Sequence, residues 1–303
     1  MSKQGATAFV LSGGTSLGAI HVGMLRALYE RGIVPDLAVA TSVGALNAAF
    51  IASRPQTLET VDALGRIWRG LTRDQVFPLN PLTGLLGFLG ASDHVVPNLE
   101  LRKLISRHME GKRLEDLPLA LHLVAVDVLT GEELRLSAGS VLEAVMASVA
   151  IPGVLPPIRW DDHVLMDGAV ANDTPISHAV ELGAREIYVL PTGHACALEE
   201  SPRGALEMAL HALSLLVQRR LMDDLEKFKD CAKLVVLPPP CPLAITPIDF
   251  GHADELIVRA YADAGKFLDD GAAARPPIRM FMHRHDSHAR VGRVDSPGKR
   301  QTR

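Results

Sequence analysis

The stretch Val39-Ala40-Thr41-Ser42-Val43-Gly44-Ala45 decides how this chain is expected to fold. Apolar residues 37–40 predict a strand before Ser42, and the helix-forming run 45–52 follows it. A serine at the sharp turn between a strand and a helix is a nucleophile elbow, in which a strained backbone exposes the hydroxyl group. Gly44 lets the strand and the helix approach closely. The amides that open such a helix suit a developing oxyanion.

The motif is incomplete, because Ala40 stands where the pattern G-x-S-x-G has its first glycine. A second interpretation is an ordinary strand-to-helix turn in which Ser42 caps the helix. Taken alone, the motif leaves both interpretations open.

Composition points to an α/β protein. The chain has 303 residues, of which 48% are hydrophobic and 22% are charged, enough for one large domain or two small ones. Aromatic residues are few and aliphatic residues are many, which fits a buried parallel sheet. The formal net charge of −4 does not favour binding to nucleic acid.

The chain carries three cysteines, Cys196, Cys231 and Cys241, without C-x-x-C spacing. We expect free thiols in a reducing compartment. Residues 1–5 are short and polar, without a signal-peptide pattern, and no continuous apolar span is long enough to cross a membrane. These features predict a cytoplasmic protein.

A glycine-rich loop, Ser12-Gly13-Gly14-Thr15-Ser16-Leu17-Gly18, lies between a predicted strand at 7–11 and a predicted helix at 18–31. Its amides could cradle a phosphate, form an oxyanion hole, or make a tight turn that binds nothing. The loop lacks the lysine and Ser/Thr pair of a P-loop. Because the carboxyl ends of parallel strands meet at one edge of a sheet, the loop and Ser42 can come together, which favours the oxyanion hole.

Asp167 is the second candidate. It ends a short apolar strand predicted at 164–166 and precedes Gly168, which permits a tight turn. A carboxylate so placed can act as a base toward a serine hydroxyl. The alternative is an aspartate that caps a turn through its own backbone.

The predicted domain spans residues 5–271, and residues 272–303 are expected to form a disordered basic tail. The apolar segment 76–91 is either a lid or lipid-facing surface near the site, or a loop packed on the core. A long helix is predicted at 203–228; its apolar part 205–217 either packs in the core, which is the favoured interpretation, or lies over the site. Further strands are predicted at 120–129, 133–136, 186–190 and 234–237, and further helices at 58–71, 98–108, 141–149, 175–182 and 253–268.

The motifs together resemble the patatin-like phospholipase family. Residues 11–23 resemble its glycine-rich oxyanion block, and residues 41–45 resemble its nucleophile elbow. Residues 147–153, followed by Met166-Asp167-Gly168-Ala169, resemble its block that leads from a helix to the aspartate. Three blocks in the right order are far more specific than one motif. The resemblance covers about residues 7–191.

The resemblance implies a three-layer α/β/α fold with a mostly parallel central sheet. It implies a serine acyl hydrolase that cleaves carboxylic ester bonds of lipids, as a phospholipase A or lysophospholipase does, through a Ser42–Asp167 dyad without a catalytic histidine. It also implies a lipid or other acyl-ester substrate. The spacing of the histidines and carboxylates gives no second convincing set of metal ligands, so we predict no metal and no cofactor. Peripheral contact with a membrane could come from the apolar segment 76–91 and the basic tail. The residues implied for the oxyanion hole are Gly13, Gly14 and Thr15, with Val43 as a further donor, and those implied to support the turns are Gly44 and Gly168.

Three residues depart from the family pattern. Ala40 replaces the first glycine of the elbow, and Thr15 stands where a third glycine is common. Leu17 stands where the family often has arginine or lysine, which would face an anionic headgroup. The leucine in place of a basic residue favours neutral esters, lysolipids or another acyl substrate.

Other functions of the same fold remain open at this stage. A Ser–Asp–His triad is compatible with the chain order Ser42, Asp167, His194. An acyltransferase would need an acceptor alcohol that outcompetes water. A non-catalytic lipid-binding protein would bind lipid without reacting at Ser42.

Overall fold

The computed structural model describes residues 5–78, 93–109, 111–193, 205–241, 243, 245 and 248–271. The strands are β1 Thr7–Leu11, β2 Leu37–Thr41, β3 Ala120–Asp127, β4 Glu133–Leu136, β5 Ile158–Trp160, β6 His163–Asp167, β7 Glu186–Leu190 and β8 Lys233–Val236. The longer helices are α1 Ala19–Glu30, α2 Val43–Ala52, α3 Leu58–Gly70, α6 Leu99–Met109, α7 Val141–Ser148, α10 Ala205–Phe228 and α11 Ala253–Asp269. The short helices are η1 Thr15–Gly18, α4 Arg73–Val76, η2 Leu114–Asp116, α8 Ala169–Asn172 and α9 Ile176–Glu181.

Within these described residues, the strands form one eight-stranded sheet in the order β5-β6-β3-β2-β1-β7-β8, with β4 paired to β3. The pairs from β3 through β2, β1 and β7 to β8 are parallel, whereas β4, β5 and β6 are antiparallel additions. The sheet is therefore mostly parallel, as predicted. Its parallel centre brings the carboxyl ends of β1 and β2 to the same edge.

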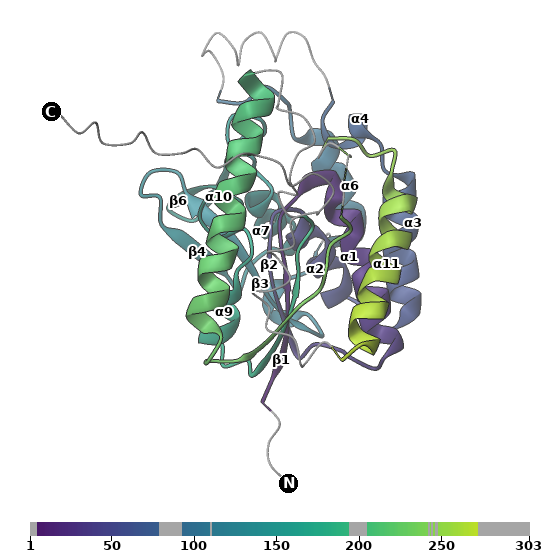
Figure 1. Ribbon diagram of the computed structural model, residues 1–303. Helices are drawn as coiled ribbons and strands as arrows, with labels where there is room; N and C mark the ends of the chain where they lie inside the picture. Colours follow the sequence, from purple (N-terminus) through teal and green to yellow (C-terminus); the bar gives the residue numbers. More distant parts are fainter. Residues whose placement is uncertain are drawn as a thin grey trace, which may run out of the picture.

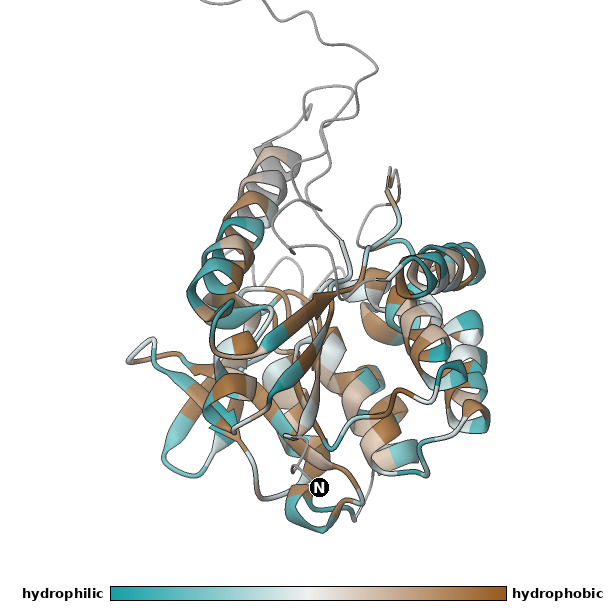
Figure 2. Cartoon of the chain, turned by 60° about the horizontal axis from the view of Figure 1, so that its bottom comes forward, coloured by the Kyte–Doolittle hydropathy of each residue, from teal (hydrophilic) through white to brown (hydrophobic). Residues whose placement is uncertain are grey.

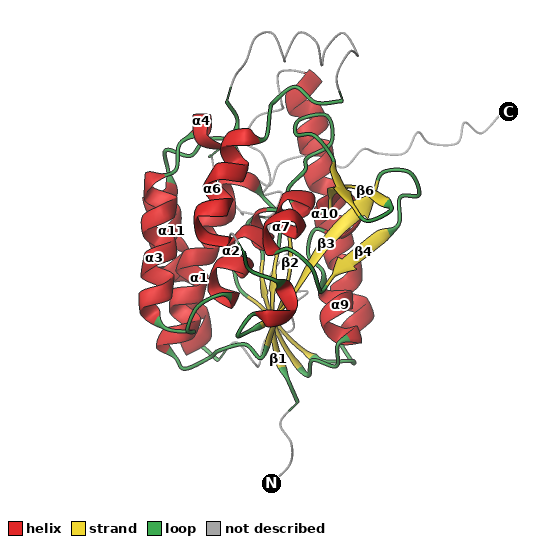
Figure 3. Ribbon diagram, turned by 180° about the vertical axis from the view of Figure 1, so that it is seen from behind, coloured by secondary structure: helices red, strands yellow, loops and turns green. Residues whose placement is uncertain are grey.

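Helices cover both faces of the sheet (Figure 1), which gives the three layers that the sequence predicted. Seen from behind, α1, α3 and α11 lie on one side of the strands and α9 and α10 on the other (Figure 3). Figure 2 shows hydrophobic residues concentrated on the central strands and on the helix faces turned toward them. A sheet covered on both faces has apolar residues at successive strand positions.

Strand β1 shows how alternation builds the two cores. Phe9 and Leu11 belong to the larger hydrophobic cluster, which includes residues of α1, α2 and α11. Ala8 and Val10 point to the other face and join a smaller cluster with residues of α9 and α10. Because successive side chains of a strand point to opposite faces, one short apolar run supplies both cores.

The structure corrects the prediction for the long helix. The described apolar side chains in the first part of α10 do not pack in the core: Met208 and Leu215 are 47% exposed, and Leu216 is 68% exposed. Its later residues Leu221 and Leu225 are buried instead. Hydrophobicity alone did not indicate which part of this helix faces the sheet.

The thiol prediction is correct for Cys231, which is free and exposed, and wrong for Cys241, which is disulfide-bonded. Most of the proposed lid segment and the whole tail at 272–303 lie outside the described residues. Among the helices that the structure describes, none combines the length and the apolar character that a membrane span requires.

Candidate active site

Ser42 lies at the turn between β2 and α2, with φ 55° and ψ −126°. A positive φ is strained for a residue other than glycine, so the surrounding fold holds this turn in place. The close packing around Gly44 is one of the features that hold the turn in place. A β-carbon there would overlap the backbone of β1 and lie 2.6 Å from the carbonyl oxygen of Ser12. The predicted need for a small residue after the serine therefore has a specific cause, the close passage of α2 over the end of β1.

Asp167 ends β6 and meets Ser42 directly. The hydroxyl of Ser42 donates a hydrogen bond to Oδ2 of Asp167 at 2.7 Å. Oδ1 accepts from the backbone N–H of Ala169 at 2.8 Å, which fixes the plane of the carboxylate. Both side chains are buried, Ser42 at 7% exposure and Asp167 at 3%. Gly168, like Gly44, packs closely against a neighbouring backbone, because a β-carbon there would lie 2.7 Å from the carbonyl carbon of Val124.

Burial raises the pKa of Asp167 from 3.8 to about 7. The hydrogen bonds from Ser42 and from the amide of Ala169 act in the opposite direction, and the nearby carboxylate of Asp173 adds to the increase. A carboxylate whose pKa lies near neutral pH is well matched to accepting a proton from a hydroxyl group.

The glycine-rich loop lies beside Ser42. Gly14 and Thr15 both have positive φ, 139° and 53°. Within the part of the chain that the structure describes, the backbone N–H groups of Gly14 and Thr15 have no acceptor, as expected for the start of a helix. Gly13 differs, because its N–H donates to the carbonyl oxygen of Asp173 at 3.3 Å. Gly13 could therefore bind an oxyanion only by exchanging this bond.

Ser148 has a role at the site that the sequence did not reveal. Its side chain has no exposed surface. The Ser148 hydroxyl accepts from the backbone N–H of Ser42 at 3.0 Å and donates to the carbonyl oxygen of Val124 at 2.6 Å. It thus ties the turn at Ser42 to strand β3. In the sequence, Ser148 stood out only as a member of the segment 147–153 that resembles the family block.

Asp173 is the other group that the sequence did not reveal. A β-carbon at Gly13 would overlap Oδ1 of Asp173 and lie 3.2 Å from Cβ of Ser42, so both residues flank the same side of Gly13. Burial raises the pKa of Asp173 to about 6, against the hydrogen bonds from the Thr174 hydroxyl and from the amide of Gly13. Two carboxylates with raised pKa values therefore lie around Ser42.

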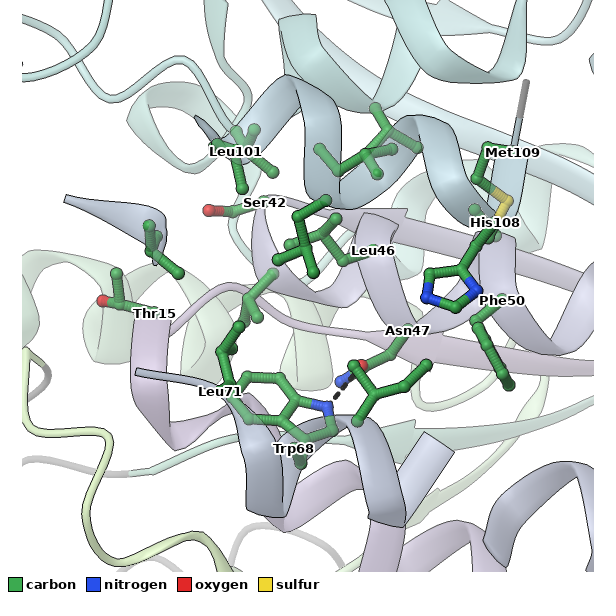
Figure 4. Close-up of a pocket in the computed structure, with 18 of the residues that line it drawn as sticks. Thr15, Ser42, Leu46, Asn47, Phe50, Trp68, Leu71, Leu101, His108 and Met109 are labelled. Carbon is green, nitrogen blue, oxygen red and sulfur yellow. Dashed lines mark hydrogen bonds between the residues drawn. The ribbon is translucent and has the colours of Figure 1, made fainter. Parts of the chain in front are cut away.

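An apolar cavity extends from Ser42 between α2, α3, α6 and α7. Thr15 and Ser42 lie at one end, and Phe50, His108 and Met109 lie at the other (Figure 4). Val76 and Phe77, the described start of the proposed lid segment, also line it. The other lining residues are Val43, Leu46, Asn47, Ala49, Leu64, Ile67, Trp68, Leu71, Leu101, Leu104, Ile105, Val145, Val149, Ile151, Leu155 and Phe250.

A buried polar network supports the wall of this cavity. The indole N–H of Trp68 donates to Oδ1 of Asn47 at 2.9 Å, and Nδ2 of Asn47 lies 3.1 Å from Nδ1 of His21. Nε2 of His21 lies 2.9 Å from the carbonyl oxygen of Leu190. Burial lowers the pKa of His21 to about 4, so the ring is neutral at physiological pH. Both ring nitrogens of His21 thus bind Asn47 and Leu190, and neither binds Ser42.

In the described ranges, no group of three or more His, Cys, Asp or Glu side chains is arranged to hold a metal ion. His194, the third member of the alternative triad, lies outside those ranges.

The fold and this site define a class: an α/β protein in which a serine at a strand-to-helix turn donates to a buried carboxylate beside an apolar cavity. The model of the patatin-like phospholipase family matches residues 9–180, which is more than half of the chain. The chain belongs to this family.

Two relatives show how the match is distributed. Patatin-like phospholipase domain-containing protein 6 of Mus musculus is 31% identical over 192 residues, which are 61% of this chain and 13% of that protein. Lysophospholipase nte1 of Emericella nidulans is 25% identical over 292 residues, 87% of this chain and 18% of that protein. The chain thus spans less than a fifth of the length of these relatives.

Among solved structures, VipD from Legionella pneumophila is similar with a TM-score of 0.47 and 16% sequence identity. The similarity covers 88% of this chain and 67% of that one.

Proposed function

We propose that the protein is a serine acyl hydrolase that cleaves carboxylic ester bonds of lipids. The observation that carries this proposal is the direct 2.7 Å hydrogen bond from Ser42 to Asp167 at the end of an apolar cavity. The family supports it, since the family and the relatives described above are named as phospholipases and a lysophospholipase.

Acylation begins with Asp167 as the base. Asp167 takes the proton of the Ser42 hydroxyl while Oγ attacks the ester carbonyl carbon. The resulting tetrahedral oxyanion receives hydrogen bonds from the amides of Gly14 and Thr15, with Val43 as a further donor at the start of α2. Collapse of this intermediate returns the proton to the leaving alcohol and leaves an acyl group on Ser42. Loss of one oxyanion donor costs roughly 2.7–4 kcal/mol of transition-state stabilisation in well-studied enzymes.

Deacylation repeats the same chemistry with water. Asp167 takes a proton from the water molecule that attacks the acyl carbonyl, and Ser42 leaves with that proton. The pKa of Asp167, raised to about 7 by burial, supports both directions of proton transfer near neutral pH.

The lining of the cavity supports a lipid whose headgroup, next to the reacting ester, is neutral or weakly charged. Its lining includes no lysine or arginine among the described residues, and its walls are aliphatic and aromatic. Leu17, which stands where the family often has arginine or lysine, is buried in the main hydrophobic cluster. We therefore assign lysophospholipids and monoacyl neutral lipids as the substrate class, with the single acyl chain lying along the cavity toward His108.

The described contacts support the dyad, while His194, the histidine of the alternative triad, lies outside the described residues. Ser42 contacts Asp167 without an intervening ring, and His21, the buried histidine nearest in sequence to the loop, is engaged by Asn47 and Leu190. No specific observation favours the acyltransferase or the non-catalytic alternative. Membrane contact and a cytoplasmic location stay predictions.

The test compares the parent protein with Ser42→Ala on a monoacyl phospholipid and on a monoacylglycerol, with release of free fatty acid as the readout. We expect turnover by the parent and a loss of at least about 1,000-fold in the variant, since it lacks the nucleophile. Ser106→Ala is the matched control, because Ser106 lies on α6 and does not line the cavity. Lipid that binds without fatty-acid release would contradict the proposal, and faster loss of ester with an added alcohol would indicate acyl transfer.

A further inference from the structure

Two buried hydroxyl groups hold one peptide of the glycine-rich loop. The carbonyl oxygen of Gly13 accepts a hydrogen bond from the hydroxyl of Ser12 at 3.0 Å and another, shorter one from the hydroxyl of Thr192. Ser12 is 2% exposed and Thr192 is 5% exposed. Thr192 is 179 positions from Gly13 in the sequence and lies just beyond the end of β7.

Ser12 and Thr192 also contact each other directly. The backbone N–H of Thr192 donates to the hydroxyl oxygen of Ser12 at 3.0 Å, and the two side-chain oxygens lie 3.4 Å apart. Ser12 itself is fixed by its N–H, which donates to the carbonyl oxygen of Leu190 at 3.2 Å. Ser12, the first residue of the loop, and Thr192 thus form a clamp on the Gly13 carbonyl, and both lie just beyond the ends of the neighbouring strands β1 and β7.

Holding this carbonyl fixes the direction of an amide. A trans peptide is planar, and its C=O and N–H point in opposite directions. The Gly13 carbonyl belongs to the same peptide as the N–H of Gly14. With the oxygen held by Ser12 and Thr192, the Gly14 N–H points away from them, and no described residue accepts its hydrogen.

The loop would not keep this orientation by itself. Gly14 has φ 139°, outside the regions of regular structure and open in practice to glycine alone. Its Cα packs so closely on Thr192 that an added β-carbon would lie 2.7 Å from the Thr192 β-carbon. The hydroxyl of Thr192 therefore contacts the loop at the one peptide whose rotation would turn the free N–H away.

We propose that Thr192, together with Ser12, is a positioning residue that aims the Gly14 N–H at the oxyanion formed on the Ser42 acyl adduct. This inference rests on the proposed function. An oxyanion donor contributes most when it is oriented before the reaction starts, so the clamp acts on the transition state and not on the binding of lipid. The side chain of Thr192 therefore affects kcat without contacting the substrate.

The test replaces the hydroxyl while keeping the shape. Thr192→Val should lower kcat by about 10–100-fold and leave KM within about twofold, because a misplaced donor weakens only transition-state binding. Thr192→Ser keeps the hydroxyl and should recover most of the lost kcat. Thr60→Val is the matched control: Thr60 is also buried and donates to a backbone carbonyl, that of Pro55 at 2.6 Å, at the start of α3.

A purely structural role predicts a different pattern. It would lower kcat in Thr192→Val and in Thr60→Val alike, in proportion to their loss of thermal stability, with no recovery in Thr192→Ser. That pattern, or a rise in KM at constant kcat, would overturn the inference. Should Thr192→Val fail to fold, Ser12→Ala removes the other donor to the same carbonyl and is expected to lower kcat in the same way.

The two levels of the proposal fail separately. A parent that neither reacts at Ser42 nor releases fatty acid contradicts the proposed function and the clamp together. A parent that turns over ester normally, with Thr192→Val equally fast, contradicts the clamp alone.

Discussion

The Ser42 hydroxyl and the Asp167 carboxylate are 125 positions apart in the sequence and 2.7 Å apart in the structure. Strand β6, which carries Asp167, pairs antiparallel with β3, whereas β2, which leads to Ser42, pairs parallel with β3 on its other side. The two strands end opposite adjacent residues of β3, because Thr41 pairs with Val124 and Asp167 pairs with Ala125. The pair is thus a product of sheet topology.

Asp167→Asn should remove activity and raise stability. With a pKa of 3.8 in the unfolded chain and about 7 when folded, Asp167 keeps a proton in the folded protein that the unfolded chain has released. Its contribution to stability is complete below pH 3.8 and is lost as pH rises through about 7. Asparagine is neutral throughout, so it should raise the free energy of unfolding at pH 8 by about 1–3 kcal/mol.

Urea unfolding of the parent and of Asp167→Asn at pH 5 and pH 8 measures this effect. The advantage of the variant should grow between the two values. A variant that is less stable than the parent at pH 8 would show that the Ser42–Asp167 bond outweighs the burial of the charge.

Activity should rise with pH through the pKa of Asp167. The base must be unprotonated to accept the Ser42 proton, so kcat/KM should increase as pH rises and level off above about 7. Asp173→Asn removes a negative charge that raises the pKa of Asp167, so the midpoint should move to lower pH. The measurement is a pH profile of ester hydrolysis for both proteins. An unchanged midpoint in Asp173→Asn would contradict the coupling.

Ser148→Ala should slow catalysis by about tenfold, because the N–H of Ser42 loses its acceptor and the strained turn loosens. A lost buried hydrogen bond also destabilises, by about 1–3 kcal/mol. Ser140→Ala is the control at the opposite end of α7, where Ser140 accepts from the N–H of Glu143 as a helix cap. It should lower stability by about 1 kcal/mol with no effect on kcat. Equal kcat values in the two variants would leave Ser148 without a catalytic role.

Gly44→Ala should strongly destabilise the fold. The added methyl group would overlap backbone atoms of Leu11 and Ser12, which cannot move without shifting β1. Gly70 is the matched control, since a β-carbon at this last residue of α3 meets no atom within 4 Å. Gly70→Ala should therefore leave the melting temperature equal or higher, whereas Gly44→Ala should lower it by several degrees or prevent folding. A melting temperature unchanged in Gly44→Ala would contradict the close packing of α2 on β1.

Much of this fold could be predicted because local pattern and tertiary position agree. The bounds of β1, β4 and β7 match the predicted ones, since each is a short run bounded by clear turns. Strand β5 was missed. It has three residues at the edge of the sheet, directly after Pro156 and Pro157, and its pairing with β6 comes from a partner that no local period reveals.

The residues of the candidate site also fall into those that the sequence indicated and those that it did not. Ser42, Asp167 and the glycine-rich loop stand in motifs, so the sequence could indicate them. Ser148 and Thr192 act through single hydroxyl groups whose partners are distant in the chain, and a buried serine or threonine carries no local signal of the carbonyl it will meet. Helix α10 was misjudged for a related reason: an apolar run predicts burial, but the sheet ends before the first part of that helix (Figure 1).

Reaction of the parent protein with a fluorophosphonate probe, with the modified residue located by peptide mass spectrometry, shows directly whether Asp167 activates Ser42. We expect one modified residue, Ser42, with no modification in Ser42→Ala and much slower modification in Asp167→Asn at pH 8. Modification at another serine, or a rate in Asp167→Asn equal to that of the parent, would contradict a serine activated by Asp167.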